Sequence, residues 1–148
     1  VDMSDEMEPA HAGTPWHLWA VGVVSLLWNS FGCFDFTMTA TRNEAYLSSY
    51  PAEMLAYWFA MPVWVWALWA IGVFGGFFGS VMLLLRRKLA FPLFSASFLA
   101  AAISMLVGTL DKNAPRMEGA GVMSAIIVLI AAIFAFYAWW LSRRDVLR

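Results

Sequence analysis

Hydrophobic residues gather into four blocks along the chain, separated by short polar stretches. The blocks cover about residues 16–38, 57–85, 91–110 and 121–141. At about 1.5 Å per helical residue, each block is long enough to cross the roughly 30 Å apolar core of a bilayer. Buried helices of soluble proteins seldom repeat such lengths four times. The pattern therefore predicts an all-α integral membrane protein, with a four-helix bundle over residues 16–142.

The second block is longer than one bilayer crossing needs. Either its helix tilts, or Pro62 marks a kink or the true start of the helix. The stretch SSYPAEMLAYWF, which enters this block, predicts a short interfacial helix opened by Pro51. Before the first block, Thr14 and Pro15 predict a helix start, with the Thr14 hydroxyl as its cap.

Lysine and arginine are distributed unevenly between the two sides of the predicted bundle. The side that holds both termini carries Arg86, Arg87, Lys88, Arg143, Arg144 and Arg148. The opposite side carries Arg42, Lys112 and Arg116. Because short cytoplasmic loops are enriched in these residues, we expect both termini to face the cytoplasm. An acidic tail over residues 1–15 and a basic tail over residues 143–148 flank the bundle.

Small residues spaced four apart mark the second block as a site of close helix packing. They are Gly72, Gly75, Gly76, Gly79 and Ser80. A spacing of four places small residues on one face of a helix, where another backbone can approach closely. The pattern fits packing inside the bundle as well as docking to another membrane subunit. Both alternatives stay open at the level of sequence.

Three polar residues interrupt the first block. On a helical wheel Ser25, Asn29 and Asp35 fall within one arc of about 160°, so they face the bundle interior or a partner. Asn29, near mid-span, predicts a hydrogen bond between helices worth roughly 0.6–2 kcal/mol. Asp35 lies near the end of the span, where we expect it at headgroup level, paired with Arg42 or Arg116. The alternative is a functional carboxylate inside the membrane.

Composition and motifs narrow the function classes. The chain is 62% hydrophobic and 13% charged, with a net charge of −1, so it lacks the basic surface that nucleic acid requires. The single Cys33 excludes an internal disulfide. The sequence has no phosphate-binding loop, no nucleophile motif and no metal-spaced histidine or cysteine cluster. We therefore assign no catalytic residues and no metal ligands, and expect a non-enzymatic role.

Four residues are weak candidates for contact with a cofactor. His11 lies in the tail, whereas His17 opens the first span and is a candidate ligand for a single pigment or metal, although an interfacial histidine is more often solvated. Trp64, Trp66 and Trp69 point in different directions around the second span, so at least one faces lipid, a partner or a bound molecule. No cofactor of its own is expected. An aromatic groove would suit a bound lipid, quinone or carotenoid tail.

Two runs carry a resemblance to a known group of proteins. SLLWNSFGCFDFTMTATRNEAYL and MPVWVWALWAIGVFGGFFGSVMLLLRRKLA resemble small, uncharacterised four-span inner-membrane proteins of proteobacteria, some automatically labelled "sugar transporter". The likeness covers about residues 16–110 and rests on Trp28, Asn29, Asp35, Asn43, residues 37–39 and the second span. It implies a bacterial inner membrane, cytoplasmic or intracytoplasmic, and transfers no catalytic residue.

Two functions from different classes fit these observations. The first is a non-enzymatic accessory or structural subunit of a larger bioenergetic or photosynthetic membrane complex. It would contact lipids and other subunits through its small-residue and aromatic helix faces. The alternative is a small-solute transporter or channel that acts as an oligomer, because four spans are few for alternating access. A membrane enzyme acting on lipid or quinone ranks last.

Overall fold

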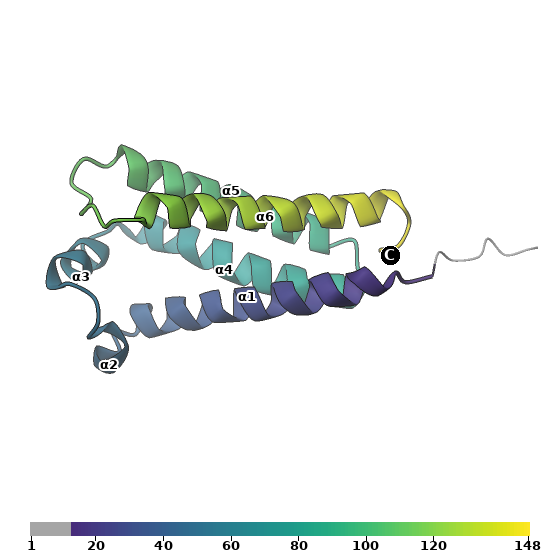
Figure 1. Ribbon diagram of the computed structural model, residues 1–148, viewed down its shortest axis with the longest axis horizontal. Helices are drawn as coiled ribbons and strands as arrows, with labels where there is room; N and C mark the ends of the chain where they lie inside the picture. The colour runs from purple at the N-terminus through teal and green to yellow at the C-terminus, as the bar shows by residue number, and fades with distance from the viewer. Residues whose placement is uncertain (1–12) are drawn as a thin grey trace, which may run out of the picture.

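The computed structural model describes residues 13–148, so His11 and most of the predicted acidic tail lie outside the described residues. Six helices follow one another in this range. They are α1 (Trp16–Ala40), α2 (Glu44–Leu47), α3 (Ala52–Phe59), α4 (Val63–Leu84), α5 (Ala90–Leu110) and α6 (Ala120–Arg143) (Figure 1). Helices α1, α4, α5 and α6 are long and apolar enough to cross a membrane. The predicted all-α membrane bundle is confirmed.

Only the second of the four predicted spans begins more than one residue away from its predicted start. Helix α4 starts at Val63 with Pro62 as its N-cap, and α3 ends at Phe59. The predicted range of 57–85 was therefore too long at its start. Proline has no backbone N–H and its ring crowds the preceding turn, so it separates two helices rather than continuing one. Pro62 marks the true start of the second span.

The start of α1 corrects a second prediction. Pro15 occupies the N-cap position and no side chain caps the helix. The Thr14 hydroxyl does not cap it; Thr14 Oγ1 accepts a hydrogen bond from Arg86 Nη1 at 2.7 Å. This contact instead joins the beginning of α1 to the α4–α5 connection.

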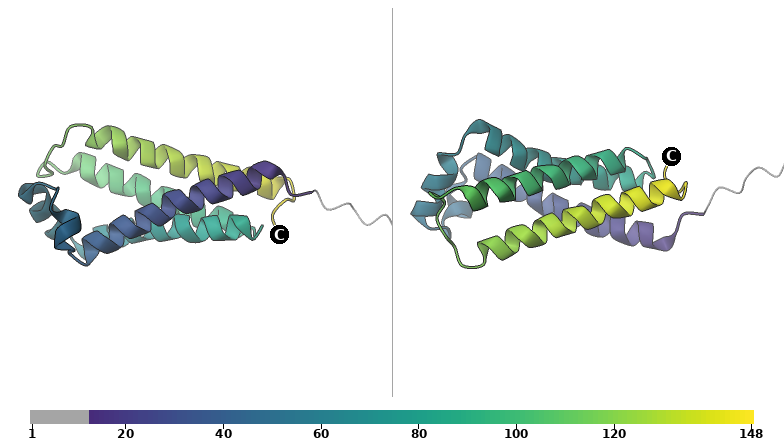
Figure 2. Two further views of the ribbon diagram at one scale, coloured as in Figure 1. Left: turned by 60° about the horizontal axis from the view of Figure 1, so that its bottom comes forward. Right: turned by 90° about the horizontal axis from the view of Figure 1, so that it is seen from above.

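The long helices pack in the order α1, α4, α5, α6, each against the next (Figure 2). Helices α1 and α6 meet only at the end where both described termini lie. There His17 Nδ1 and the Tyr137 hydroxyl are 2.5 Å apart. Away from this contact the two helices diverge, as Figures 1 and 2 both show. Helices α1 and α6 therefore do not pack against each other over most of their length. Which membrane side holds the termini stays a prediction.

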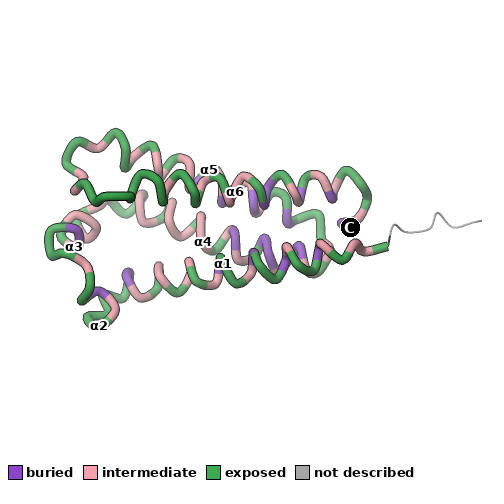
Figure 3. The backbone as a smooth tube through the Cα atoms, in the orientation of Figure 1, coloured by how far each residue is buried: buried purple, intermediate pink, exposed green. Residues whose placement is uncertain are grey.

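Buried residues are also distributed unevenly along the length of the bundle. The core cluster consists of Leu18, Leu83, Ala90, Phe94, Phe134, Ala135, Ala138, Leu141 and Leu147. Figure 3 shows that most buried residues gather toward the terminal end. The opposite half holds fewer of them, because α1 and α6 have separated there. One end of the bundle is tightly packed and the other has room inside.

The basic tail is packed rather than free. The Arg148 N–H donates to the Arg86 carbonyl and the Lys88 N–H donates to the Arg148 carbonyl, both at 2.7 Å. Leu147 enters the core and is 2% exposed. The tail thus folds back along the α4–α5 connection and brings the cations of both segments to one end of the bundle.

The small residues of α4 contact two neighbouring helices. A Cβ placed on Gly76 would lie 2.0 Å from Asn29 Oδ1 on α1. On the other side, a Cβ on Gly79 would lie 3.0 Å from the Phe94 ring, and one on Gly75 would lie 3.3 Å from the Leu93 carbonyl oxygen. These glycines let α4 pack closely between α1 and α5. Packing inside the bundle therefore accounts for them, as it does for the buried Ser80.

Candidate functional site

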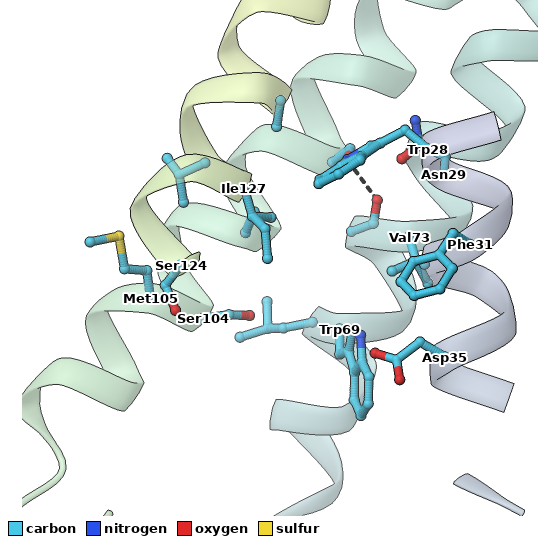
Figure 4. Close-up of a pocket in the computed structure, with 18 of the residues that line it drawn as sticks. Trp28, Asn29, Phe31, Asp35, Trp69, Val73, Ser104, Met105, Ser124 and Ile127 are labelled. Atoms are coloured by element: carbon cyan, nitrogen blue, oxygen red, sulfur yellow. Dashed lines mark hydrogen bonds between the residues drawn. The ribbon is translucent and has the colours of Figure 1, made fainter. Parts of the chain in front are cut away.

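A cavity of about 610 Å³ lies among α1, α4, α5 and α6, in the loosely packed half of the bundle. Its size falls within the range of about 300–1,000 Å³ typical of sites for small molecules and cofactors. In Figure 4, Trp28, Phe31 and Asp35 border it on the α1 side, and Met105, Ser124 and Ile127 border it opposite. This cavity is the candidate site.

The cavity opens sideways, between the two helices that diverge. Trp28 and Phe31 of α1 line it and are 41% and 65% exposed. Met123 and Ile127 of α6 line it from the other side and are 55% and 41% exposed. Because these helices span the membrane, the opening faces the acyl chains of the bilayer.

Asn29 forms part of the cavity wall and also ties α1 to α4. Its Nδ2 group donates to the Ser25 carbonyl at 2.8 Å and to Ser80 Oγ at 3.5 Å. Ser25 is fully buried beside it and donates to the Gly22 carbonyl at 3.0 Å. The Asn29 amide thus makes the interhelical contact that the sequence predicts, with its donor directed at α4.

Asp35 lies at the outer edge of the cavity, and its partner differs from the prediction. It accepts a hydrogen bond from the Tyr46 hydroxyl, and neither Arg42 nor Arg116 pairs with it. The Arg42 guanidinium instead lies 4.3 Å from the centre of the Phe59 ring. The chain turns back directly after α1, which brings α2 alongside Asp35. This hydrogen bond raises the pKa of Tyr46 to about 12.

Serine hydroxyls add polarity to the wall formed by α5 and α6. Ser97 Oγ donates to the Gly72 carbonyl at 2.5 Å. Ser104 Oγ is buried and has no hydrogen-bond partner among the described residues. Figure 4 shows the Ser104 side chain extending toward the cavity. A buried hydroxyl without a partner costs about 1–3 kcal/mol.

The three candidate tryptophans have different surroundings. Trp69 lines the cavity, whereas Trp66 stacks on Phe59 with ring centroids 6.2 Å apart, and Trp64 is 55% exposed. Trp64 and Trp66 do not lie deep in the second span. Because α4 begins at Val63, both residues belong to its first turns, near the membrane edge.

His17 is remote from the cavity. It packs against Tyr137 and Trp140 at the terminal end of the bundle.

Cys33 Sγ donates to the Val73 carbonyl at 3.4 Å. Within residues 13–148, no group of three or more His, Cys, Asp or Glu side chains is arranged to hold a metal ion.

Several residues of the site were not found from the sequence. Ser104, Tyr46 and Ser124 were not identified as site residues. The spacing of Ser97 and Ser104, seven residues apart, was an available signal, because it places both hydroxyls on one helix face. A second signal was their position in the middle of an apolar span.

A second tyrosine–aspartate pair joins the connections at the open end of the bundle. The Tyr57 hydroxyl of α3 donates to Asp111 Oδ2 at 2.6 Å, and the Asn113 N–H donates to Asp111 Oδ1 at 2.9 Å. Burial and this hydrogen bond raise the pKa of Tyr57 to about 12. The same two hydrogen bonds lower the pKa of Asp111.

This pair gives a testable dependence of stability on pH. The folded state favours neutral Tyr57, so its contribution is present below the ordinary tyrosine pKa of 10.0 and is lost as pH rises through about 12. Tyr57→Phe should therefore reduce the fall of the thermal midpoint between pH 9.5 and 11.5, roughly by half because Tyr46 has a similar shift. Tyr50→Phe is the matched control. An unchanged pH profile in Tyr57→Phe would contradict the expectation.

Comparisons of the chain with protein-family models, with curated proteins and with solved structures find no match. The resemblance seen in the sequence stays a prediction.

Proposed function

We propose that the chain is a non-enzymatic accessory subunit of a bacterial inner-membrane complex and holds one amphiphilic molecule between α1 and α6. The guest belongs to the lipid, quinone or carotenoid class, with a long apolar part and an oxygen-bearing group. The observation that carries this proposal is the cavity of about 610 Å³ that opens sideways at membrane depth.

The chemistry of the cavity supports an amphiphile. Trp28, Trp69 and Ile127 offer apolar and aromatic surface to an extended tail or a flat ring. Ser104 offers a hydroxyl without a protein partner, which can donate to a carbonyl or hydroxyl oxygen. A few polar groups on a mostly apolar wall are the usual means by which such sites orient a ligand.

The exposed face of α6 supports the accessory role. Among the four spans, α6 is the least buried. Its exposed side chains repeat at alternating spacings of four and three, in the order Val122, Ile126, Leu129, Ile133, Phe136. This is the spacing of a seam along which a second helix packs.

Filling the cavity tests the binding role. Ala131 lines the cavity, whereas Ala125 is exposed on the same helix and does not line it, so Ala131→Phe and Ala125→Phe form a matched pair. Each variant is reconstituted in nanodiscs and photolabelled with diazirine derivatives of a short-chain quinone and of a fatty acid. We expect Ala131→Phe to lower labelling of α1 and α6 peptides about tenfold, with Ala125→Phe unchanged. Equal labelling of both variants, or labelling spread evenly around the bundle, would overturn the proposed site.

Two further measurements test the accessory role against the transporter alternative. A stoichiometric partner should copurify after mild detergent extraction and be lost in Ile133→Ser, whereas purification of the chain alone would contradict the accessory role. Solute uptake into vesicles is compared for the wild type, Asp35→Asn and Asn29→Leu. Uptake that depends on these residues would favour the transporter. The structure instead directs the Asn29 donor at α4.

A further inference from the structure

A second pocket, of about 440 Å³, lies at the opposite end of the bundle from the loops that join α1 to α4. The beginning of α1 contributes Pro15 and His17, and the end of α6 contributes Trp140 and Arg144. These two segments are adjacent because α1 and α6 meet at this end (Figure 2). The pocket is separate from the large cavity, and a ligand bound in it would be independent of the proposed function.

Arg144 and His17 are held in place by their neighbours. The Arg144 guanidinium lies 4.3 Å from the centre of the Trp140 ring. A guanidinium stacked on a ring keeps the N–H donors at its edge available for a planar or tetrahedral anion. His17 uses Nδ1 in its hydrogen bond with Tyr137, which fixes the orientation of the imidazole ring. The pocket thus presents a positioned cation next to a positioned ring with a second nitrogen.

The surroundings of the pocket are strongly basic. The cations at this end are Arg86, Arg87, Lys88, Arg143, Arg144 and Arg148, whereas Asp145 is the only acid among the described residues there. Three of these cations contact uncharged groups. Arg86 donates to the Thr14 hydroxyl, and Arg143 and Arg144 lie over the rings of Trp139 and Trp140. The folded-back tail keeps these charges together, so this end attracts an anion.

The pocket also lies at the level of lipid headgroups. It is formed where two membrane-spanning helices begin and end, at Trp16 and Arg143. Trp16 is 78% exposed and Trp139 is 40% exposed, and such rings prefer the boundary between headgroups and acyl chains. An anionic phospholipid places its phosphate at this depth and its acyl chains in the apolar core.

We propose that this pocket binds the phosphate group of an anionic phospholipid, with Arg144 as its main ligand and Trp140 as the platform that holds Arg144. Arginine suits this role because its fork of donors matches the oxygens of a phosphate. The acyl chains extend from the pocket along the exposed apolar surface of α1 and α6. Negative lipids gather on the cytoplasmic leaflet, the side on which the sequence places this end.

Native mass spectrometry of the full chain in detergent tests the proposal, with phosphatidylglycerol and phosphatidylcholine of identical acyl chains as probes. We expect the wild type to bind phosphatidylglycerol about tenfold more tightly than phosphatidylcholine, and Arg144→Gln to lose most of this preference. Arg143→Gln changes the net charge equally but lies outside the pocket, and should stay within about twofold of the wild type. Arg144→Lys keeps the charge without the fork and should lose about threefold.

Three results would overturn the proposal. Equal losses in Arg143→Gln and Arg144→Gln would show a diffuse field of charge instead of a site. Equal affinity of the wild type for both lipids would show that the pocket does not select a negatively charged headgroup. Displacement of phosphatidylglycerol by inorganic phosphate at about a thousandfold excess would assign the pocket to free anions, because a bound lipid also gains from its acyl chains. Circular dichroism of each variant confirms that its helices are intact.

Discussion

Gly76→Ala should lower the free energy of unfolding by about 2 kcal/mol, because the new methyl group has no space at the α1–α4 contact. A Cβ at this position would lie 2.0 Å from Asn29 Oδ1 and 2.6 Å from Asn29 Cγ. Asn29 is itself buried, so its side chain can yield only by giving up its hydrogen bonds to Ser25 and Ser80. The cost therefore combines overpacking with the loss of a tie between two helices.

A double-mutant cycle identifies the clash as the cause. Asn29→Ala alone should cost about 1 kcal/mol, the typical value of a hydrogen bond between membrane helices. It also removes the atoms that the new methyl group would meet. The double variant should therefore be about as stable as Asn29→Ala alone, which gives a coupling energy of about 2 kcal/mol.

Gly108→Ala is the matched control for this cycle. Gly108 lies in the membrane-spanning helix α5, and a Cβ there would meet nothing within 4 Å. Its replacement should leave stability unchanged or raise it slightly, because alanine is the better helix former. Unfolding in mixed micelles of increasing SDS content measures all four variants. Additive effects of Gly76→Ala and Asn29→Ala would contradict the assigned contact.

Phe94→Ala should cost about 3 kcal/mol, the largest loss we expect from one side chain of the core. Phe94 is 1% exposed and belongs to the packed end of the bundle. Its ring lies against Gly79 of α4 and 5.7 Å from the Phe134 ring of α6. Because lipid is as apolar as a protein core, the loss arises from contacts left unmade around a cavity rather than from exposure to water.

Phe91→Ala provides the control on the same helix. Phe91 is 37% exposed and should cost less than about 1 kcal/mol, because lipid replaces the lost ring. Phe94→Leu should fall between the two alanine variants, since it keeps part of the buried volume. The same SDS titration measures each variant. Equal losses at positions 91 and 94 would show that α5 does not pack between α4 and α6 through this face.

The core cluster and the cavity lie toward opposite ends of the bundle and meet at Phe94 and Phe134, which belong to the core and also line the cavity. The core cluster, the α1–α6 contact at His17 and the folded-back tail all lie at one end. The cavity lies toward the other, where Tyr46 and Tyr57 fasten the connecting segments. Packed side chains at the first end keep α1 and α6 together. Their divergence beyond it leaves room for a guest without loss of the fold.

The amino-acid sequence was sufficient to predict the four spans and the buried side of the first of them. Spans depend on length and local hydropathy, and each long helix satisfies its own backbone hydrogen bonds, so neighbours are not needed to find it. The helical period places Ser25 and Asn29 on one face, and both are buried. The sequence also offered Pro62 as one possible start of the second span, because a proline interrupts a helix through its own ring and its missing N–H.

Only the tertiary structure decided which helices meet and where they part. Asp35 receives its hydrogen bond from Tyr46 rather than from an arginine, because the turn after α1 determines what reaches it. The small residues of α4 contact two helices of the same bundle. Both cavities exist because α1 and α6 touch at one end and diverge beyond it. Helix rotation and crossing arise from the packing of many side chains at once, which no local pattern of residues records.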